Sequence, residues 1–253
     1  MIGKKVNFRI SRVDAGSSSA FLVHSDVVNW ILLQAGSDIT LIDAGYPGQA
    51  SDVVESIRQI GGRPEDIRGA LLTHAHVDHL GGLVSLSEQY GFDVFMDPVE
   101  VSHARRDHLQ QAGPADIVPI AYRPRVLRWL ATVTPLGVLS RTGIPDAKPF
   151  PDPLDLPGRP LPVAAHGHTD GHSAYLVADG QVLVSGDALV SGHPISKIDG
   201  PQCISNAFQH DVETARRTVR SFTTLDATTL FPGHGPRVDG SVAAAARRAL
   251  EVS

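Results

Sequence analysis

The sequence has 253 residues, of which 42% are hydrophobic and 19% charged, and its formal net charge at pH 7 is -5. This composition is typical of a folded globular chain that is long enough to bury a substantial core, which excludes a disordered protein. Because the net charge is negative and no run of basic residues occurs, we expect no nucleic-acid partner.

No part of the sequence resembles a targeting or membrane segment. Residues 1–16 lack the apolar core of a signal peptide, and no stretch approaches the roughly 18 apolar residues of a membrane helix. We therefore expect a cytoplasmic protein with no membrane partner. Cys203 is the only cysteine, expected to be a small buried residue, which excludes a disulfide within the chain and leaves nitrogen and oxygen as the main metal ligands.

The first part of the chain predicts strands followed by alternating helices and strands. Short β-branched runs separated by Ser, Asp and Gly indicate meandering strands, and apolar side chains at helical spacing indicate two helices. The expected order is strands, helix, strand, helix, strand, over residues 7–43, 47–60, 69–72, 80–90 and 93–96. The strand at 69–72 would deliver its C-terminal end to Thr73 and His74.

The segment 98–162 differs in composition from the rest of the chain, because it holds twelve of the eighteen prolines. Residues 145–162 contain too many prolines for regular helix or sheet. Residues 126–139, with Trp129 and Leu130, are strongly apolar but too short to span a bilayer. We expect the segment to form a lid over a site, where it would contact an apolar or acyl group of a substrate; packing on the body of the domain or a homodimer contact is the alternative.

Strand patterns resume after this segment. Asp179-Gly180 is a hairpin signal between two of the strands. Strands are expected at 161–165, 173–177, 182–185 and 228–231, and helices at 212–222 and 241–250. The chain thus has two β-rich halves, each finished by helices, and we expect one domain spanning 1–253 with a lid-like insertion at about 98–162.

Histidines cluster in a way that points to metal binding. Seven of the twelve fall in three windows, HAHVDH at 74–79, HGHTDGH at 166–172 and PGHG around His234. A turn leaving a strand can aim His74 and His76 at one point while Asp78 and His79 face a second point nearby. Imidazoles suit zinc and related metals, and a carboxylate reaching both ions would help to hold two dications close together. Asp187, directly after a strand, is the candidate for that bridge.

The order of the motifs is similar to that of the metallo-β-lactamase superfamily. The resemblance covers nearly the whole chain, through TLIDAG at 40–45, THAHVDHLGG at 73–82, GHTDGH at 167–172, SGDAL at 185–189 and FPGHG at 231–235. It implies an α/β fold, an αββα sandwich of two mixed β-sheets flanked by helices, with the helical, proline-rich segment inserted. It also implies that one metal is held by His74, His76 and His168, the other by Asp78, His79 and His234, and that Asp187 bridges them.

Three further residues are assigned beside these ligands. His166 competes with His168 for one ligand position, because alternate residues leaving a strand share a face, and we favour His168 on the GHT motif. His172 matches a histidine behind the ligands of glyoxalase-like members, with a plain turn histidine as the alternative. Asp43 is expected to orient the HAHVDH loop by hydrogen bonds, with helix capping as the alternative.

Such a site would catalyse hydrolysis. Two divalent metal ions, with Zn²⁺ preferred and Mn²⁺, Fe²⁺ or Co²⁺ accepted by the same ligands, would generate a bridging hydroxide as nucleophile and polarise a carbonyl. Asp78 would orient the hydroxide and pass a proton to the leaving group, so it is the expected catalytic residue. The substrate is expected to be a small carboxylic ester, lactone or thioester.

Departures from other branches narrow this expectation. True β-lactamases of this fold have cysteine or serine in place of Asp187 and are exported, and nucleases depend on basic surfaces, so both are disfavoured. Glyoxalase II and acyl-homoserine lactone lactonases remain, although a basic glutathione-binding cluster and the lactonase tyrosine are missing. The alternatives are a mononuclear iron enzyme resembling persulfide dioxygenases, a β-lactamase-like amide hydrolase, or a binding protein without activity.

Overall fold

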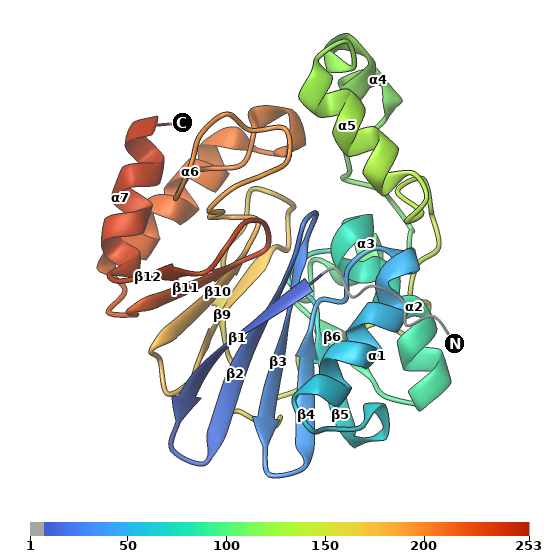
Figure 1. Ribbon diagram of the computed structural model, residues 1–253, viewed down its shortest axis with the longest axis vertical. Helices are drawn as coiled ribbons and strands as arrows, with labels where there is room; N and C mark the ends of the chain where they lie inside the picture. The colour runs from blue at the N-terminus through green and yellow to red at the C-terminus, as the bar shows by residue number, and fades with distance from the viewer. Residues whose placement is uncertain (1–7, 253) are drawn as a thin grey trace.

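Two mixed β-sheets pack face to face in the computed structural model, which describes residues 8–252 (Figure 1). Residues 1–7 and 253, among them Asn7 at the start of the expected strands, lie outside the described part. The expected αββα sandwich is confirmed. No helix within residues 8–252 combines the length and apolarity needed to cross a bilayer.

The first sheet has seven strands in chain order. These are β1 (Phe8–Ala15), β2 (Ser18–Ser25), β3 (Asn29–Ala35), β4 (Asp38–Ile42), β5 (Ile67–Leu71), β6 (Val94–Met96) and β7 (Lys148–Pro149). Strands β1 to β4 are antiparallel neighbours, whereas β4 to β7 run parallel. The parallel strands all end at one edge of the sheet, which becomes the site.

The second sheet has five strands in the order β12-β11-β10-β9-β8. They are β8 (Leu161–Ala164), β9 (Ser173–Val177), β10 (Val182–Gly186), β11 (Thr229–Pro232) and β12 (Val238–Asp239). The hairpin predicted at Asp179-Gly180 joins the antiparallel strands β9 and β10. Strand β11 lies parallel to β10, so their C-terminal ends also share an edge.

The α-helices of residues 8–252 lie on the outer faces of both sheets and above one edge of the sandwich (Figure 1). They are α1 (Ala50–Gln59), α2 (Val77–Tyr90), α3 (Val101–Ala104), α4 (Pro114–Ile117), α5 (Pro124–Val133), α6 (Val212–Ser221) and α7 (Val242–Val252). Helices α1 and α2 cover the first sheet, and α6 and α7 cover the second (Figure 1). Cys203, half-buried instead of fully buried, packs beside α7.

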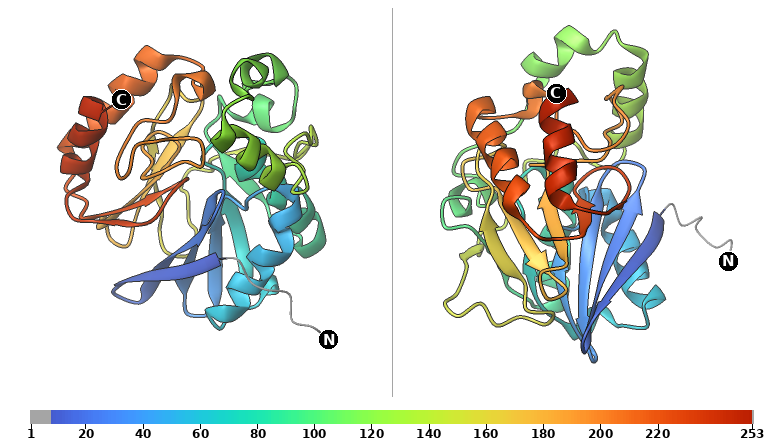
Figure 2. Two further views of the ribbon diagram at one scale, coloured as in Figure 1. Left: turned by 45° about the horizontal axis from the view of Figure 1, so that its top comes forward. Right: turned by 90° about the vertical axis from the view of Figure 1, so that its left-hand side faces the viewer.

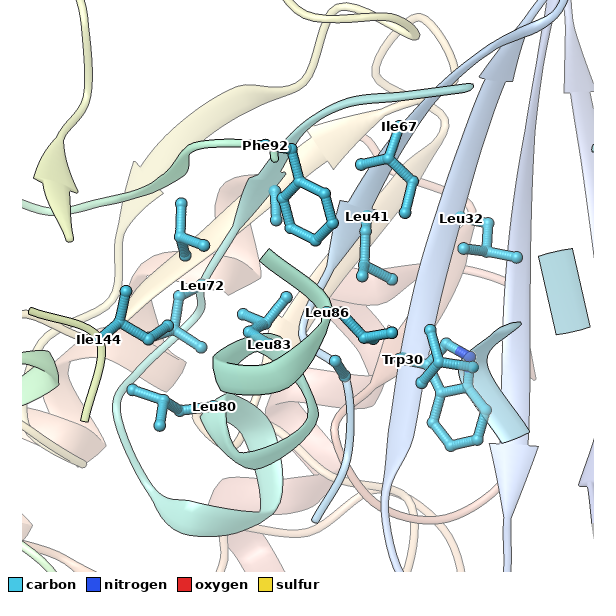
Figure 3. Packing of buried hydrophobic residues seen from close by; sticks show 14 of the residues in the cluster. Trp30, Leu32, Leu41, Ile67, Leu72, Leu80, Leu83, Leu86, Phe92 and Ile144 are labelled. Atoms are coloured by element: carbon cyan, nitrogen blue, oxygen red, sulfur yellow. The ribbon is translucent and has the colours of Figure 1, made fainter. Parts of the chain in front are cut away.

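Alternation along the central strands separates two layers of core. In β3, Trp30 and Leu32 face the helices on the outer side of the first sheet, where they join the same cluster as Leu83 of α2 (Figure 3). The indole N–H of Trp30 donates to the hydroxyl of Ser56 in α1. Ile31 and Leu33 of the same strand point into the space between the sheets. Because successive strand residues face opposite sides, a strand buried on both faces is apolar throughout. This double burial makes the sheets a rigid support for the loops at their edge.

Two expectations about local structure need correction. Helix α2 begins at Val77, not Leu80, so Asp78 lies in its first turn, where a negative charge interacts favourably with the exposed N–H groups. The proline-rich residues 145–162 contain strand β7 and the first two residues of β8, and β7 pairs with β6 through Lys148 and Pro149. A proline is tolerated there because β7 is the last strand of its sheet and the ladder loses little.

Helices α4 and α5 stand above the edge of the sandwich, in green in the ribbon views (Figure 2). Helix α5 covers only the first part of the apolar segment 126–139, and Pro135 follows its end. Its buried face carries Val126, Trp129 and Val133, which pack with Tyr46 below. We refer to residues 109–141 as the lid segment.

Candidate metal centre

The ends of the strands bring all seven predicted ligands to one edge of the sandwich. Strand β5 leads to His74 and His76, and the first turn of α2 adds Asp78 and His79. From the second sheet, the β8–β9 loop supplies His168, β10 leads to Asp187, and β11 leads to His234. Loops at the carboxyl ends of parallel strands are the usual place for a site in such sheets.

Three groups of potential ligand atoms result, and within each group all the atoms lie within 4.8 Å of one another. The groups are His74 with His76 and His168, Asp78 with His79 and His234, and His74 with His79 and Asp187. The first two are the ligand sets that the sequence predicts for two metals, and the third connects them. The described residues therefore form a cluster able to hold a dinuclear centre.

Asp187 lies between the two sets. Its Oδ2 is 3.2 Å from Nε2 of His234 and 3.6 Å from Nε2 of His168, and its Oδ1 is 3.4 Å from Nε2 of His79. The carboxylate thus faces histidines of both groups with one oxygen or the other. This is the arrangement that a bridging carboxylate requires.

Hydrogen bonds behind the first group orient its imidazoles. His76 uses Nε2 to bond the carbonyl of Gln110 at 2.7 Å, and His168 uses Nδ1 to bond the side chain of Gln209 at 3.1 Å. A ring nitrogen that donates a hydrogen bond leaves the other nitrogen as a lone-pair donor. The free nitrogens, Nδ1 of His76 and Nε2 of His168, lie 3.1 Å apart and face the same point.

The second group is oriented in the same way. His79 places Nδ1 2.8 Å from Oδ2 of Asp43, and His234 places Nδ1 2.6 Å from the carbonyl oxygen of Val27. Both rings therefore present Nε2 to the centre. Nε2 of His234 is 3.4 Å from Oδ2 of Asp78, and Nε2 of His79 is 4.0 Å from the same oxygen. Anchored imidazoles of this kind are typical of metal ligands.

Three buried atoms of the cluster have no hydrogen-bond partner among the described residues. They are Nε2 of His74, Nε2 of His79 and Oδ1 of Asp187. A buried polar atom without a partner costs roughly 1–3 kcal/mol, so native proteins rarely leave several together. A cation at the centre would satisfy all three, and the residues present thus fit a bound metal.

The electrostatics of the two groups differ. In the first, burial lowers the pKa of His76 to about 4 and holds the pKa values of His74 and His168 well below the ordinary range. In the second, burial opposes charge, but the carboxylates of Asp187 and Asp78 raise the pKa of His234 to about 10. The carboxylates therefore create a field that favours positive charge at this point, as a bound cation requires.

Asp43 and His172, the two residues predicted to stand behind the ligands, both form hydrogen bonds next to the cluster. Asp43, which is buried with φ of 58°, accepts hydrogen bonds from the backbone and hydroxyl of Thr73 as well as facing His79. His172 accepts a hydrogen bond at Nε2 from the backbone N–H of Asp187 at 3.0 Å. These contacts hold the HAHVDH loop and the carboxylate between the groups in place.

His166 does not join the cluster. Its Nε2 lies 3.4 Å from Asp97, and its side chain is 39% exposed, whereas that of His168 is 1% exposed. Because Gly167 between them has a φ of 120°, the backbone departs from the extended strand that would place both imidazoles on one face. The structure therefore brings His168, not His166, to the first group.

Glu100 is a functional candidate that the sequence analysis missed. It is 1% exposed, and its carboxylate accepts hydrogen bonds from the backbone of Ala75, His103, the hydroxyl of Thr169 and the backbone of Gly171. Burial would raise the pKa of Glu100, but these bonds and the charge of His103 lower it to about 2. The carboxylate ties together two ligand-bearing loops. The sequence signal that could have identified Glu100 is its position shortly after the strand predicted at 93–96.

A cavity of about 500 Å³ opens onto the cluster. Its floor includes Asp78, Asp187 and His234, and its wall and roof come largely from the lid segment. Side chains that line it above the cluster include Leu109, Ile117, Trp129, Leu130, Val138 and Leu139. The lid segment thus encloses a mainly apolar space next to the candidate metal centre.

His193 is a second residue that the sequence analysis did not select. It lines the same cavity and packs against His234, with ring centroids 4.8 Å apart. Burial lowers its pKa to about 3. It follows Asp187 by six residues, but no motif set it apart from other loop histidines.

The chain is similar in sequence or in fold to several known proteins. The probable metallo-hydrolase YflN of Bacillus subtilis is 26% identical over 90% of this chain and 89% of its own length. A hydroxyacylglutathione hydrolase of Xanthomonas campestris is 31% identical over 64% of this chain but only 46% of its own length. The solved structure of AidC, a dizinc quorum-quenching lactonase, superposes with a TM-score of 0.60 over 92% of both chains at 16% identity, which shows a shared fold.

The family comparison agrees with the geometry of the cluster. The model of the metallo-beta-lactamase superfamily matches residues 25–234, which include every predicted ligand from His74 to His234. The chain therefore belongs to the metallo-beta-lactamase superfamily, as a hydrolase whose histidine and aspartate cluster is able to hold two metal ions.

Proposed function

We propose that the protein hydrolyses a carboxylic ester, thioester or lactone at a dinuclear centre, with Zn²⁺ as the expected metal. The observation that carries the proposal is the pair of ligand groups joined through Asp187 beneath an apolar cavity. When bound, two such ions supply a water activated to hydroxide at neutral pH and polarise a carbonyl. Nitrogen and carboxylate ligands of this kind also accept Mn²⁺, Fe²⁺ or Co²⁺.

Asp78 is the residue we propose to handle protons. Its side chain is 16% exposed and lines the cavity, whereas the histidines of its group are buried behind it. Burial would raise the pKa of Asp78, but His79 and His234 hold it below its ordinary range, so the carboxylate is ionised. An ionised oxygen facing the cavity can accept a proton from the attacking water and return it to the leaving oxygen or sulfur.

The lid segment supports a substrate with an apolar group. Trp129 and Leu130 of helix α5 and Ile117 of α4 face the cavity above the cluster. A medium-length acyl chain buries apolar surface there, at roughly 25 cal/mol per Å². One relative is a hydroxyacylglutathione hydrolase and one structural neighbour is a lactonase, and both support the same class of carbonyl chemistry.

Metal analysis combined with a substrate panel tests the proposal. The purified protein should bind two metals per chain and hydrolyse at least one acyl ester, thioester or lactone in a reaction abolished by a chelator and restored by Zn²⁺. β-Lactams serve as the amide control in the same panel. One iron per chain with oxygen uptake on a persulfide, or turnover that is insensitive to chelation, would contradict it.

A further inference from the structure

One imidazole in the cavity, that of His193, belongs to none of the ligand groups formed by the described residues. It lies on the loop that leaves β10 after Asp187. Among the side chains that line the cavity, it is the histidine not accounted for by metal binding. Its surroundings indicate a different use.

The backbone around His193 is anchored to the loop that carries His234. The backbone N–H of Ser191 donates to the carbonyl of His234 at 3.1 Å, and the Ser191 hydroxyl bonds the carbonyl of Pro236. The next turn is closed by the backbone N–H of Ser196, which donates to the carbonyl of His193 at 2.9 Å. These bonds fix the loop relative to the metal centre, so the position of the imidazole is set by the fold.

Aromatic contacts fix the ring itself. Its centroid lies 4.8 Å from that of His234, 5.4 Å from that of Phe208 and 6.1 Å from that of Trp129 in helix α5. The imidazole therefore stands between a candidate metal ligand and the lid segment. His193 and Trp129 both line the cavity that opens onto the centre.

The hydrogen bonds of the ring determine which nitrogen carries the proton. The backbone N–H of Ile195 points at Nδ1 of His193, 3.4 Å away, so Nδ1 acts as an acceptor. In a neutral imidazole whose Nδ1 accepts, Nε2 carries the hydrogen. Nε2 has no hydrogen-bond partner among the described residues. Nε2 is therefore a hydrogen-bond donor without a protein acceptor among the described residues, on a side chain that lines the cavity.

We propose that His193 is a catalytic residue whose Nε2–H donates a hydrogen bond to an oxygen of the substrate carbonyl group as negative charge develops on it. The inference rests on the hydrolase function proposed above. A fixed donor of this kind stabilises the transition state more than the ground state, because the oxygen becomes a stronger acceptor as the carbonyl is attacked. No proton is transferred by His193 in this role.

Two substitutions separate donation from packing. His193→Phe keeps a ring that can contact His234, Phe208 and Trp129 but removes the donor, whereas His193→Gln supplies an amide N–H in nearly the position of Nε2. Three quantities are measured on the zinc-loaded proteins: metal content, kcat and KM for the ester or thioester that the wild type cleaves best, and the dissociation constant of hexanoate by calorimetry. Hexanoate serves as a carboxylate product analogue, so this binding measurement does not depend on turnover.

We expect His193→Phe to keep two metals per chain, to lower kcat about 100-fold with little change in KM, and to weaken hexanoate binding about fivefold. His193→Gln should recover at least tenfold of the lost kcat and most of the affinity. Unchanged kcat and hexanoate affinity in His193→Phe would overturn the inference, and so would loss of metal, since the defect would then act through His234. If the wild type hydrolyses no substrate but binds hexanoate, and His193→Phe weakens this binding, the result contradicts the proposed function and supports the hydrogen bond from His193.

Discussion

Hydrogen-bond partners distinguish two histidines that stand two positions apart. His168 is buried and faces His76, whereas His166 is partly exposed and faces Asp97. Alternation along a strand leaves both open as ligands, and the GHT motif favours His168. The structure separates them because the backbone turns at Gly167, which has a positive φ. This difference provides a matched pair for testing the first ligand group.

We predict that His168→Ala reduces metal content from two ions per chain to one or fewer. Activity should fall at least about 100-fold, because changes behind metal ligands already cost about 10- to 100-fold. His166→Ala should keep both metals and most of the activity. Metal analysis by mass spectrometry with parallel kinetics checks both variants, and equal metal loss in the two would contradict the assignment.

Glu100 provides a residue-scale prediction on stability and pH. Its folded-state pKa of about 2 lies below the ordinary 4.5, so the ionised carboxylate stabilises the fold above pH 4.5, and this contribution is lost as the pH falls toward 2. The difference in pKa corresponds to roughly 3 kcal/mol. Glu100→Gln should therefore have a lower free energy of unfolding than the wild type at pH 7. The difference between the two proteins should narrow between pH 4.5 and 2.

Urea unfolding at several pH values measures this difference in the free energy of unfolding. Glu88→Gln, at an exposed position on helix α2, is the matched control and should follow the wild type throughout. If the difference in free energy between Glu100→Gln and the wild type stays constant down to pH 2, the lost hydrogen bonds, not the charge, determine the loss of stability.

Helix α2 carries one ligand group and packs closely against the first sheet. A Cβ added at Gly82 would lie 2.2 Å from the carbonyl oxygen of Ala44, a backbone atom that cannot give way easily. The HLGG sequence thus allows the helix to approach the loop that follows Asp43. Asp78 and His79 depend on that approach for their position.

We predict that Gly82→Ala destabilises the protein by about 1–3 kcal/mol and weakens metal binding, because the helix must move outward with its ligands. Ser85→Ala, at an exposed position one turn further along, should leave both properties close to wild type. Thermal unfolding and zinc titration of the two variants make the comparison. Wild-type zinc affinity in Gly82→Ala would show that the ligands adjust independently of the helix.

Helix α5 presents one face to the cavity and another to solvent. Leu130 lines the cavity, whereas Leu127 on the same helix is 55% exposed and lies outside the lining. If the lid segment selects the acyl group, filling its inner face should affect long substrates more than short ones. The two leucines allow this to be tested with the same substitution.

Leu130→Trp should raise KM for hexanoyl and longer substrates about tenfold relative to acetyl substrates, because the added ring occupies apolar volume that the longer chain needs. Leu127→Trp should not change this ratio. KM values across an acyl series for both variants provide the measurement, and a uniform change for all chain lengths would contradict selection by the lid segment.

At the scale of the whole molecule, metal binding and folding should be linked. The ligands come from both sheets, so a cation at the centre would connect the two halves of the sandwich. Removal of metal leaves close carboxylates and imidazoles without their shared partner. A ligand that binds only the folded state stabilises it by about 2.7 kcal/mol at 100 times its dissociation constant.

We therefore expect the chelated protein to melt at a lower temperature than the zinc-loaded protein, with full recovery on adding Zn²⁺. Calorimetric scans of both forms at fixed protein concentration measure the shift. The Asp187→Ala variant is the control and should show a smaller shift, because it lacks the carboxylate between the two groups. Equal melting temperatures with and without zinc in the wild type would contradict the linkage.

The sequence by itself determined the fold class and the seven candidate ligands. Hydrophobic alternation and helical spacing depend on local geometry, and the order of the five motifs identified the superfamily before any coordinates. The density of the cluster also indicated a metal site, because four potential ligands within residues 74–79 are more than randomly scattered histidines and aspartates would give.

Only the tertiary structure decided which other residues meet those ligands. Glu100 joins Ala75 to Gly171, and His193 meets His234 and Trp129, through contacts between segments far apart in the chain. No local sequence pattern encodes such contacts, because they depend on how the two sheets and the inserted segment pack against one another. The motifs thus predicted the chemistry of the centre, while packing placed the residues that surround it.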